Sequence, residues 1–214
     1  LDLTINTQPA IFLISYSIFN VIKKEFDINL NKANFFAGHS LGEYSALSCA
    51  GYIKFSDTLK ILRARGEAMQ NAVPKGIGGM IAILGTNIKK IEDIISGNKE
   101  HCNFQIANDN SEGQIVVSGK LKDLDILSGI LKSMNIRNIK LPVSAPFHCE
   151  LMSNATKIMR DEINKIQFNN GHNILMSNVT ADTVKDIPVI KDLLVKQIEN
   201  LSLIHISEPT RQKP

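Results

Sequence analysis

The sequence has few cysteines, and their placement argues against two kinds of site. The three cysteines, Cys49, Cys102 and Cys149, are odd in number, lie far apart and lack the C-x-x-C spacing of metal-binding and redox motifs. They indicate neither a disulfide framework nor a zinc site. A reducing, cytoplasmic setting fits them best.

Long apolar runs and clustered positive charge are scarce as well. The longest apolar run, Ala10 to Ile14, is far shorter than the about 20 residues that a membrane-spanning helix needs. Residues 1–9 lack the basic start and apolar middle of a signal peptide. The net charge is only +3, and the lysines are spread along the chain. We therefore expect neither a membrane nor a nucleic acid as a partner.

A serine stands between two glycines in the pentapeptide GHSLG at residues 38–42, which has the form G-x-S-x-G. Residues 34–38 are predicted to form a buried strand, and residues 41–50 a helix. A strand, a sharp turn holding the serine and a helix make up the setting in which this motif carries a nucleophile. The start of the helix would also direct the free N–H of Leu41 at an oxyanion formed beside Ser40.

A serine hydroxyl is a weak nucleophile, so a base should lie within hydrogen-bond reach of Ser40. Among the five histidines, His148 is the candidate base, because two prolines stiffen its segment PVSAPFHC and could hold it against a distant serine. His39 adjoins the nucleophile, and its side chain either has a positioning role or turns away and is purely structural. The remaining three, predicted to face solvent or to lie in the terminal segment, are His101, His172 and His205.

An arginine stands at the flank of a predicted buried helix face. The helix is expected over residues 57–73, with Arg63 on its polar side and Glu67 as a surface partner of Arg63. Arg65, in contrast, has no acidic neighbour three or four positions away; these neighbours are Ile61, Leu62, Ala68 and Met69. A charge at such a place needs a counter-ion. Either a distant acidic residue supplies it, or a ligand carboxylate does, gripped by the planar guanidinium.

The pattern changes in the middle of the chain. Strands are predicted at residues 80–84, 103–107, 114–118 and 136–141, and helices at residues 88–95 and 121–134. This β-α-β-β-α-β order is that of the ferredoxin-like split unit. Near the start, residues 10–26 are predicted to form a helix with Pro9 in its first turn. Its buried face would include Ile11, Ile14 and Ile22.

Four segments together carry a resemblance to a known family. They are GHSLGEYSAL, RARGEAMQ, IANDNSEGQIVVSG and LPVSAPFHC. In this order they resemble the malonyl-CoA:acyl-carrier-protein transacylases of fatty acid synthesis, and the resemblance runs from residue 6 to residue 200. It implies an α/β fold, in which an α/β-hydrolase-like acyltransferase subdomain (residues 1–75 and 144–200) carries an inserted ferredoxin-like subdomain (residues 76–143).

The resemblance also implies roles for residues of this sequence. Ser40 would accept the acyl group, with His148 as its catalytic partner and the N–H of Leu41 as an oxyanion donor. Arg65 would bind the free carboxylate of the malonyl group. Asn108 and Asn110 match asparagines near the family's active-site cleft, and together with His39 they are the further candidate substrate-binding residues.

The implied reaction is transfer rather than hydrolysis. Ser40 takes the malonyl group from malonyl-CoA, and the phosphopantetheine thiol of acyl carrier protein then receives it, in a ping-pong cycle that needs no metal or bound cofactor. Acetyl-CoA lacks the carboxylate and would leave Arg65 buried and unpaired. The full-length protein is expected to be a cytoplasmic monomer whose partners are malonyl-CoA and acyl carrier protein.

Both ends depart from the family's pattern. The chain begins with Leu1 and lacks the family's G-Q-G-S-Q-like loop, whose glutamine gives the second oxyanion donor. After Asp192 to Asn200, the family's further strand-helix region is missing. In its place, LSLIHISEPTR resembles the translation of a transposase sequencing-library adapter. Residues 201–214 are therefore expected to be a non-native tail, and the chain a fragment.

Three other interpretations stay open. A serine esterase or thioesterase would need an acid for its histidine, and Asp109 and Asp123 are candidates. An acyltransferase domain cut from a polyketide synthase is a second possibility. The ferredoxin-like unit could instead be a docking module for a carrier protein, which would bind equally well after Ser40→Ala.

We expect this chain to be poorly folded and nearly inactive, because missing strands expose sheet edges and the loss of one oxyanion donor costs about 10²–10³ in rate. The test compares its oligomeric state and malonyl-transfer rate with those of an extended protein, completed at both ends from the parent gene. Soluble, monomeric chain that works at the rate of the extended protein would contradict this expectation.

Overall fold

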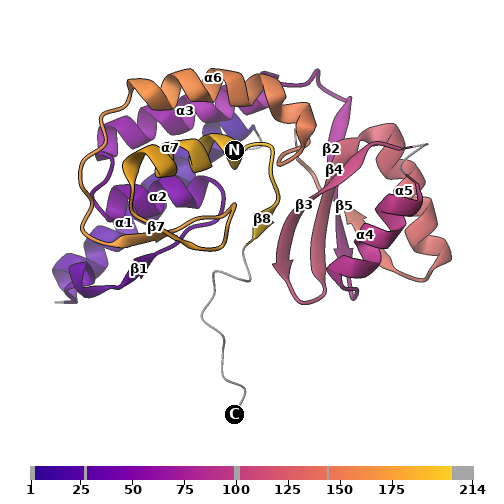
Figure 1. Ribbon diagram of the computed structural model, residues 1–214, viewed down its shortest axis with the longest axis horizontal. Helices are drawn as coiled ribbons and strands as arrows, with labels where there is room; N and C mark the ends of the chain where they lie inside the picture. Colours follow the sequence, from indigo (N-terminus) through magenta and orange to yellow (C-terminus); the bar gives the residue numbers. More distant parts are fainter. Residues whose placement is uncertain (1–2, 27, 99–101, 144, 204–214) are drawn as a thin grey trace, which may run out of the picture.

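The computed structural model describes residues 3–26, 28–98, 102–143 and 145–203, and its strands form two sheets that stand apart in Figure 1. The smaller sheet has the strand order β1-β6-β7, and the larger has the order β5-β2-β4-β3-β8. Helices surround the smaller sheet and line one side of the larger one (Figure 1). The fold is therefore a mixed α/β arrangement, as the sequence predicts.

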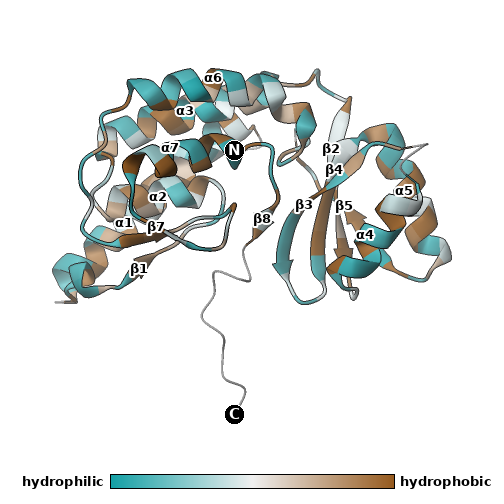
Figure 2. Cartoon of the chain, viewed as in Figure 1, coloured by the Kyte–Doolittle hydropathy of each residue, from teal (hydrophilic) through white to brown (hydrophobic). Residues whose placement is uncertain are grey.

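The half of the molecule around the smaller sheet is built from two separate stretches of the chain. The first gives α1 (Thr4–Glu25), η1 (Leu30–Lys32), β1 (Phe35–Phe36), α2 (Leu41–Cys49) and α3 (Phe55–Asn71). The second gives η2 (Glu150–Met152), α6 (Ser153–Lys165), β6 (Ile174–Met176), β7 (Thr183–Val184) and α7 (Ile187–Lys196). One apolar core joins the two stretches, with Leu47, Leu62, Met159 and Leu194 among its members. Figure 2 shows α7 as mainly hydrophobic and α6 as mainly hydrophilic.

The larger sheet comes from the middle of the chain. Its elements are β2 (Gly78–Leu84), α4 (Ile88–Gly97), β3 (Phe104–Ser111), β4 (Gln114–Lys120), α5 (Leu121–Ser133) and β5 (Arg137–Lys140). The adjacent strands β5, β2, β4 and β3 are antiparallel throughout. The β-α-β-β-α-β order expected from the sequence is confirmed, with small shifts at the ends of the elements.

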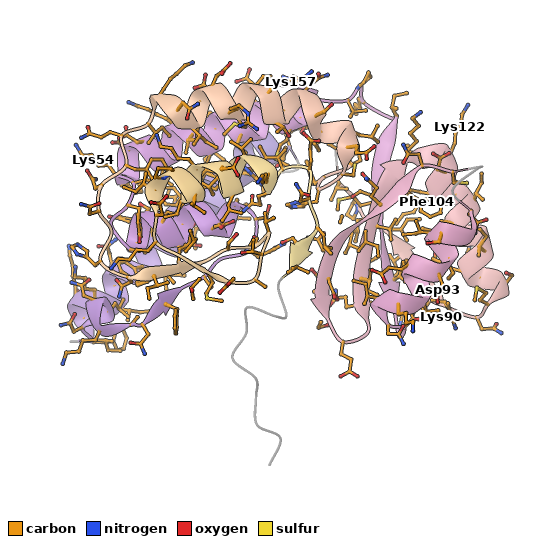
Figure 3. The ribbon with its side chains drawn as sticks, in the orientation of Figure 1. Lys54, Lys90, Asp93, Phe104, Lys122 and Lys157 are labelled. Atoms are coloured by element: carbon orange, nitrogen blue, oxygen red, sulfur yellow. The ribbon has the colours of Figure 1, made fainter. Side chains whose placement is uncertain are left out.

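Strand β2 is apolar on both faces because both faces of the larger sheet are covered. Ile81 and Ile83 pack into one core with residues of α4 and α5, whereas Met80 and Ala82 pack on the other face, where Phe147 joins them. Figure 3 shows Phe104 between the sheet and these helices, and Lys122 at the outer surface. Phe147 also packs against the core of the other half, so the two halves share a contact.

A second connection between the halves is β8 (Ser202–Leu203). It pairs in parallel with β3, opposite Asn108 and Asp109, and the N–H of Leu203 donates to the carbonyl of Asn178 at 2.9 Å. Strand β8 falls in the segment that is expected to be a non-native tail. The rest of that segment, residues 204–214, lies outside the described residues, as do His101 and His205.

The first helix differs from its prediction. It begins at Thr4, so Pro9 lies inside it, and its buried residues are Gln8 and Phe12. Ile11 and Ile14, which were expected to face the core, are exposed. Apolar residues occur all around this helix, so their periodicity does not single out the face that meets α2 and α3.

By length and mean hydropathy (1.2) α1 also qualifies as a candidate membrane span, which the short apolar run did not predict.

Pro9 has a structural consequence on the neighbouring helix. Proline has no N–H, so the carbonyl of Ile5, one turn earlier, loses its helical partner. Arg63 of α3 donates to this carbonyl at 3.4 Å and to Asn6 Oδ1 at 2.7 Å. Arg63 therefore faces α1, and the expected surface pair with Glu67 is replaced by this contact.

The strand before the serine turn is also different from its prediction. It is only two residues long, and Phe35 is 53% exposed. Strand β1 lies at the edge of the smaller sheet and, within the described residues, pairs with β6 alone. An edge strand has one open side, and the expectation of a buried strand over residues 34–38 was therefore wrong.

Helices α1 and α3 lie in close contact at Gly66. A Cβ at this position would lie 2.6 Å from Ile5 Cα and 2.8 Å from Thr4 O, so there is no room for a side chain. We expect Gly66→Ala to lower the free energy of unfolding by about 1–3 kcal/mol, as overpacking does. The matched control is Gly129→Ala in α5, where a Cβ meets nothing within 4 Å. Alanine there should stabilise by about 0.5–1 kcal/mol. Urea unfolding of the extended protein measures both, and equal effects would refute the close approach.

Candidate active site

Ser40 occupies a strained turn between β1 and α2. Its backbone has φ 53° and ψ −110°, a conformation that residues other than glycine rarely adopt and that is frequent at functional sites. The turn is so tight that a Cβ at Gly38 would lie 2.0 Å from Gly42 O. The glycine at position 38 of the motif is therefore required by the turn that presents the serine.

Asn178, in the loop after β6, holds this turn from the other side. Its Nδ2 donates to Gly38 O at 2.7 Å, and its Oδ1 accepts from the N–H of Ser40 at 2.5 Å. Asn178 is buried, so both amide groups need these partners. The second stretch of the chain thereby fixes the serine turn of the first.

His148 is placed to act as the base for Ser40. Its Nε2 lies 3.1 Å from Ser40 Oγ, and its Nδ1 lies 2.7 Å from the backbone carbonyl of Gln197. Because a carbonyl only accepts, Nδ1 carries the proton and Nε2 is the free acceptor. Burial, and secondly the charge of Arg65, lower the pKa of His148 to about 3. The imidazole is therefore neutral and able to take the serine proton at neutral pH.

A backbone carbonyl thus stands where a serine hydrolase has its acid. The two acids considered from the sequence are placed elsewhere: Asp123 accepts from the N–H of Asn103 at 3.1 Å, and Asp109 lies on β3 opposite β8. The contact of Nδ1 with Gln197 O disfavours an esterase-type acid in this position.

Arg65 is 1% exposed, yet no ion pair involves it within the described part of the chain. Neutral amides hold it: Nη1 donates to Gln8 Oε1 at 2.7 Å, and Nη2 donates to Gln197 Oε1 at 2.8 Å. Nη2 also donates to Ser40 Oγ at 3.1 Å. The guanidinium is fixed in place beside the serine with its charge uncompensated by a direct carboxylate partner, so an anionic ligand would fit it.

A cavity of about 170 Å³ opens beside these groups. Ser40, Arg65 and His148 line it together with apolar side chains, among them Met69, Met80 and Phe147. Met80 comes from the larger sheet and Met69 from α3, so the cavity lies between the two halves. A cavity of this size suits a small acyl group beside the serine. Within the described residues, no group of three or more His, Cys, Asp or Glu side chains is placed to hold a metal ion.

His39 lines the same cavity and does not turn away from it. Its Nε2 lies 3.1 Å from Asn108 Nδ2, and its ring centroid lies 6.3 Å from that of His148. The residue as a whole is exposed, but desolvation of the ring and, secondly, the charge of Arg65 lower its pKa to about 4. The neutral ring therefore accepts from the Asn108 amide. His172, by contrast, is exposed as predicted.

Of two further predicted site residues, Leu41 reaches the cavity and Asn110 does not. Leu41 is the first residue of α2 and lines the cavity. The next two N–H groups bond to His39 O and Ser40 O, while within the described residues the N–H of Leu41 has no acceptor. Asn110, on β3, is not among the residues that line the cavity, and its Oδ1 is buried without a hydrogen-bond partner in the described structure.

Sequence reasoning missed four polar residues that hold this site together: Gln8, Glu43, Asn178 and Gln197. A signal existed for one of them. Gln197 follows Ile190 and Leu194 by seven and three positions, so it falls on the apolar stripe of α7. A glutamine on a buried helix face needs partners.

Comparisons with known proteins agree with this geometry. The acyl transferase domain family matches residues 1–198. A malonyl CoA-acyl carrier protein transacylase of Bacillus subtilis is 39% identical over 200 residues, which are 92% of this chain and 62% of that protein. The crystal structure of an acyl-carrier-protein-S-malonyltransferase from Bartonella henselae superposes with a TM-score of 0.90 at 39% identity, covering 94% of this chain and 65% of that one.

A third relative has been solved with a partner. It is a malonyl-transacylase in complex with a type II PKS acyl-carrier protein, 32% identical to this chain, with a TM-score of 0.89 over 95% of this chain and 65% of that one. The chain spans less than two thirds of the length of these relatives.

The lowered pKa of His148 makes stability depend on pH in a defined direction. Between pH 6.5 and about 3, the unfolded chain binds a proton at this histidine and the folded chain does not. The free energy of unfolding should therefore fall as the pH is lowered through this range. We expect His148→Gln to flatten that fall, as measured by urea unfolding of the extended protein at pH 7.5 and pH 5, whereas replacing the exposed His172 by glutamine should not. Identical pH slopes for all three proteins would contradict the buried neutral histidine.

Proposed function

The chain belongs to the acyl transferase domain family, and from that membership we propose that the protein is a malonyl-CoA:acyl-carrier-protein transacylase. It would move the malonyl group from CoA to the phosphopantetheine thiol of acyl carrier protein by way of an ester on Ser40. One observation carries the proposal: a buried arginine without a direct carboxylate partner lies 3.1 Å from the serine hydroxyl. The named relatives are a transacylase and a malonyltransferase of the same kind.

In the first half-reaction, Ser40 Oγ attacks the thioester carbonyl of malonyl-CoA while His148 Nε2 takes the hydroxyl proton. The carbonyl oxygen becomes an oxyanion, which the N–H of Leu41 can receive at the start of α2. The C–S bond then breaks, and CoA leaves as a thiol with the proton that His148 returns. The Gln197 carbonyl, bonded to Nδ1, stabilises the imidazolium that forms in between.

The carboxylate of the malonyl group is recognised by Arg65. Gln8 and Gln197 hold the guanidinium from two sides, so its plane is set before substrate arrives, and little entropy is lost on binding. An acetyl group brings no carboxylate, and it would leave the cation buried without a partner. A malonyl carboxylate gains a charge-assisted pairing with this cation that an acetyl group cannot make, and this difference is the basis of selection.

In the second half-reaction, the phosphopantetheine thiol of acyl carrier protein attacks the malonyl ester. His148 Nε2 accepts the thiol proton and passes it to Ser40 Oγ as the ester C–O bond breaks. The serine is restored and the malonyl group leaves as a thioester of the carrier. The relative that was solved with an acyl-carrier protein supports this class of partner.

The division of labour between the two halves is part of the proposal. Residues 1–75 and 144–200 would be an α/β-hydrolase-like catalytic subdomain, which carries Ser40 and His148. Residues 76–143 would be a ferredoxin-like subdomain, and the strand order β5-β2-β4-β3 supports this assignment. It supplies Asn108 and Met80 to the cavity. We further propose that the protein acts in the cytoplasm as a monomer.

Intact-protein mass spectrometry after brief incubation with malonyl-CoA, acetyl-CoA or both tests the proposal on this chain and on the extended protein. On the extended protein we expect a malonyl adduct that Ser40→Ala abolishes. Arg65→Ala should shift labelling from malonyl towards acetyl, because the carboxylate then has no cation to bind. Arg63→Ala is the matched control: this arginine is on the same helix but faces Asn6, and the variant should label like the wild type.

Two outcomes would refute the proposal. Absence of any adduct on the extended protein would remove the acyl-enzyme. Rapid hydrolysis of short neutral esters, with no preference for malonyl-CoA, would favour the esterase interpretation instead.

A further inference from the structure

Glu43 is a buried acid that the mechanism above does not use. It lies in the first turn of α2, three residues after Ser40, and is 1% exposed. It is not among the residues that line the cavity, so it does not reach the substrate. Its carboxyl oxygen Oε2 accepts from Gln197 Nε2, and the backbone of Asn178 also bonds to the carboxyl group.

Glu43 helps to decide which way the Gln197 side chain points. A primary amide has one oxygen and one NH₂ group, which have opposite hydrogen-bonding character. Gln197 Oε1 accepts from Arg65 Nη2 at 2.8 Å, and Nε2 donates to Ser40 O at 3.1 Å and to Glu43. In the reversed orientation, NH₂ would face the donor of Arg65 and the oxygen would face two acceptors. The amide is 0% exposed, so water cannot repair such mismatches.

We propose that Glu43 is a positioning residue for substrate selection: it fixes the amide of Gln197, and through that amide it holds the Arg65 guanidinium in the plane that receives the carboxylate of the acyl group. This inference rests on the proposed function, because it concerns how malonyl is told from acetyl. Glu43 acts indirectly, through Gln197, so that the guanidinium fork of Arg65 stays available to the substrate carboxylate. A direct ion pair would occupy that fork.

The electrostatics agree with this placement. Burial raises the pKa of Glu43 to about 7, while the bonds from Gln197 and Asn178 and the charge of Arg65 oppose the rise. The protonated and ionised carboxyl groups both have an oxygen that accepts from Gln197 Nε2. The charged and titratable groups that lie close to Glu43 are Arg65 on α3 and Tyr44 on α2.

The test compares kcat/KM for acylation of Ser40 by malonyl-CoA and by acetyl-CoA in the extended protein. Glu43→Met has the length of glutamate but no acceptor. We expect it to lower the malonyl value about 10- to 100-fold, since a misplaced clamp of this kind costs up to about 10² in rate. The acetyl value should change less than about 3-fold, since acetyl makes no use of the clamp. Glu43→Gln, which can present an oxygen to Nε2, should restore most of the preference.

Two further variants isolate the route through Gln197. Gln197→Met keeps the backbone carbonyl for His148 but removes the amide, so it should lose malonyl preference as Glu43→Met does, and the double variant should be no worse than either single one. Ser48→Ala on the same helix is the control: its buried hydroxyl has no partner in the described structure, and both values should stay unchanged. Should Glu43→Met not fold, Gln197→Met still tests the route, because a retained malonyl preference would exclude it.

The outcomes separate the two proposals. Equal losses for both substrates in Glu43→Met, or additive losses in the double variant, would overturn the positioning role and leave the proposed function standing. A Gln197→Met protein that keeps its malonyl preference would do the same. A wild-type protein without malonyl preference would overturn both.

Discussion

A buried guanidinium held by neutral amides is the constraint on which the site depends. Arg65 cannot stay charged at 1% exposure without partners, and the two amides among its partners come from opposite ends of the described chain. Gln8 lies on α1 and Gln197 just beyond α7. Both glutamines must lie beside Arg65 for the cation to have these partners, so the site depends on segments that are far apart in the sequence.

The serine and its base depend on the same convergence. Ser40 and His148 both have positive φ, at 53° and 56°, and such strained backbone persists only where neighbours over-determine it. Asn178 bonds both sides of the serine turn, and Gln197 contributes its carbonyl to His148 and its side chain to Ser40 and Arg65. Two polar residues from the second stretch of the chain thus fix Ser40 and Arg65 of the first stretch and His148 of the second.

Patterns within short windows of the sequence predicted the features that depend on neighbouring residues. The elements of the larger sheet, the serine turn with its helix, and the isolation of Arg65 all follow from spacing within short windows. Periodicity failed on α1, which is apolar on every side, so only its tertiary contacts reveal that Gln8 and Phe12 face inward. The roles of Asn178 and Glu43 were not predictable either, because each depends on partners that the chain brings together across long separations. A direct carboxylate partner for Arg65 was one of two expected solutions, and amides take its place.

The central claim is that Arg65 selects an acyl group on Ser40 by its free carboxylate. The most direct measurement is a crystal structure of the extended protein trapped with malonyl-CoA before transfer. We predict an ester on Ser40 Oγ whose carboxylate lies within hydrogen-bonding distance of the Arg65 guanidinium, with Gln8 and Gln197 still bonded to that side chain. An ester whose carboxylate points to solvent or to another cation, or acylation at a residue other than Ser40, would contradict the claim.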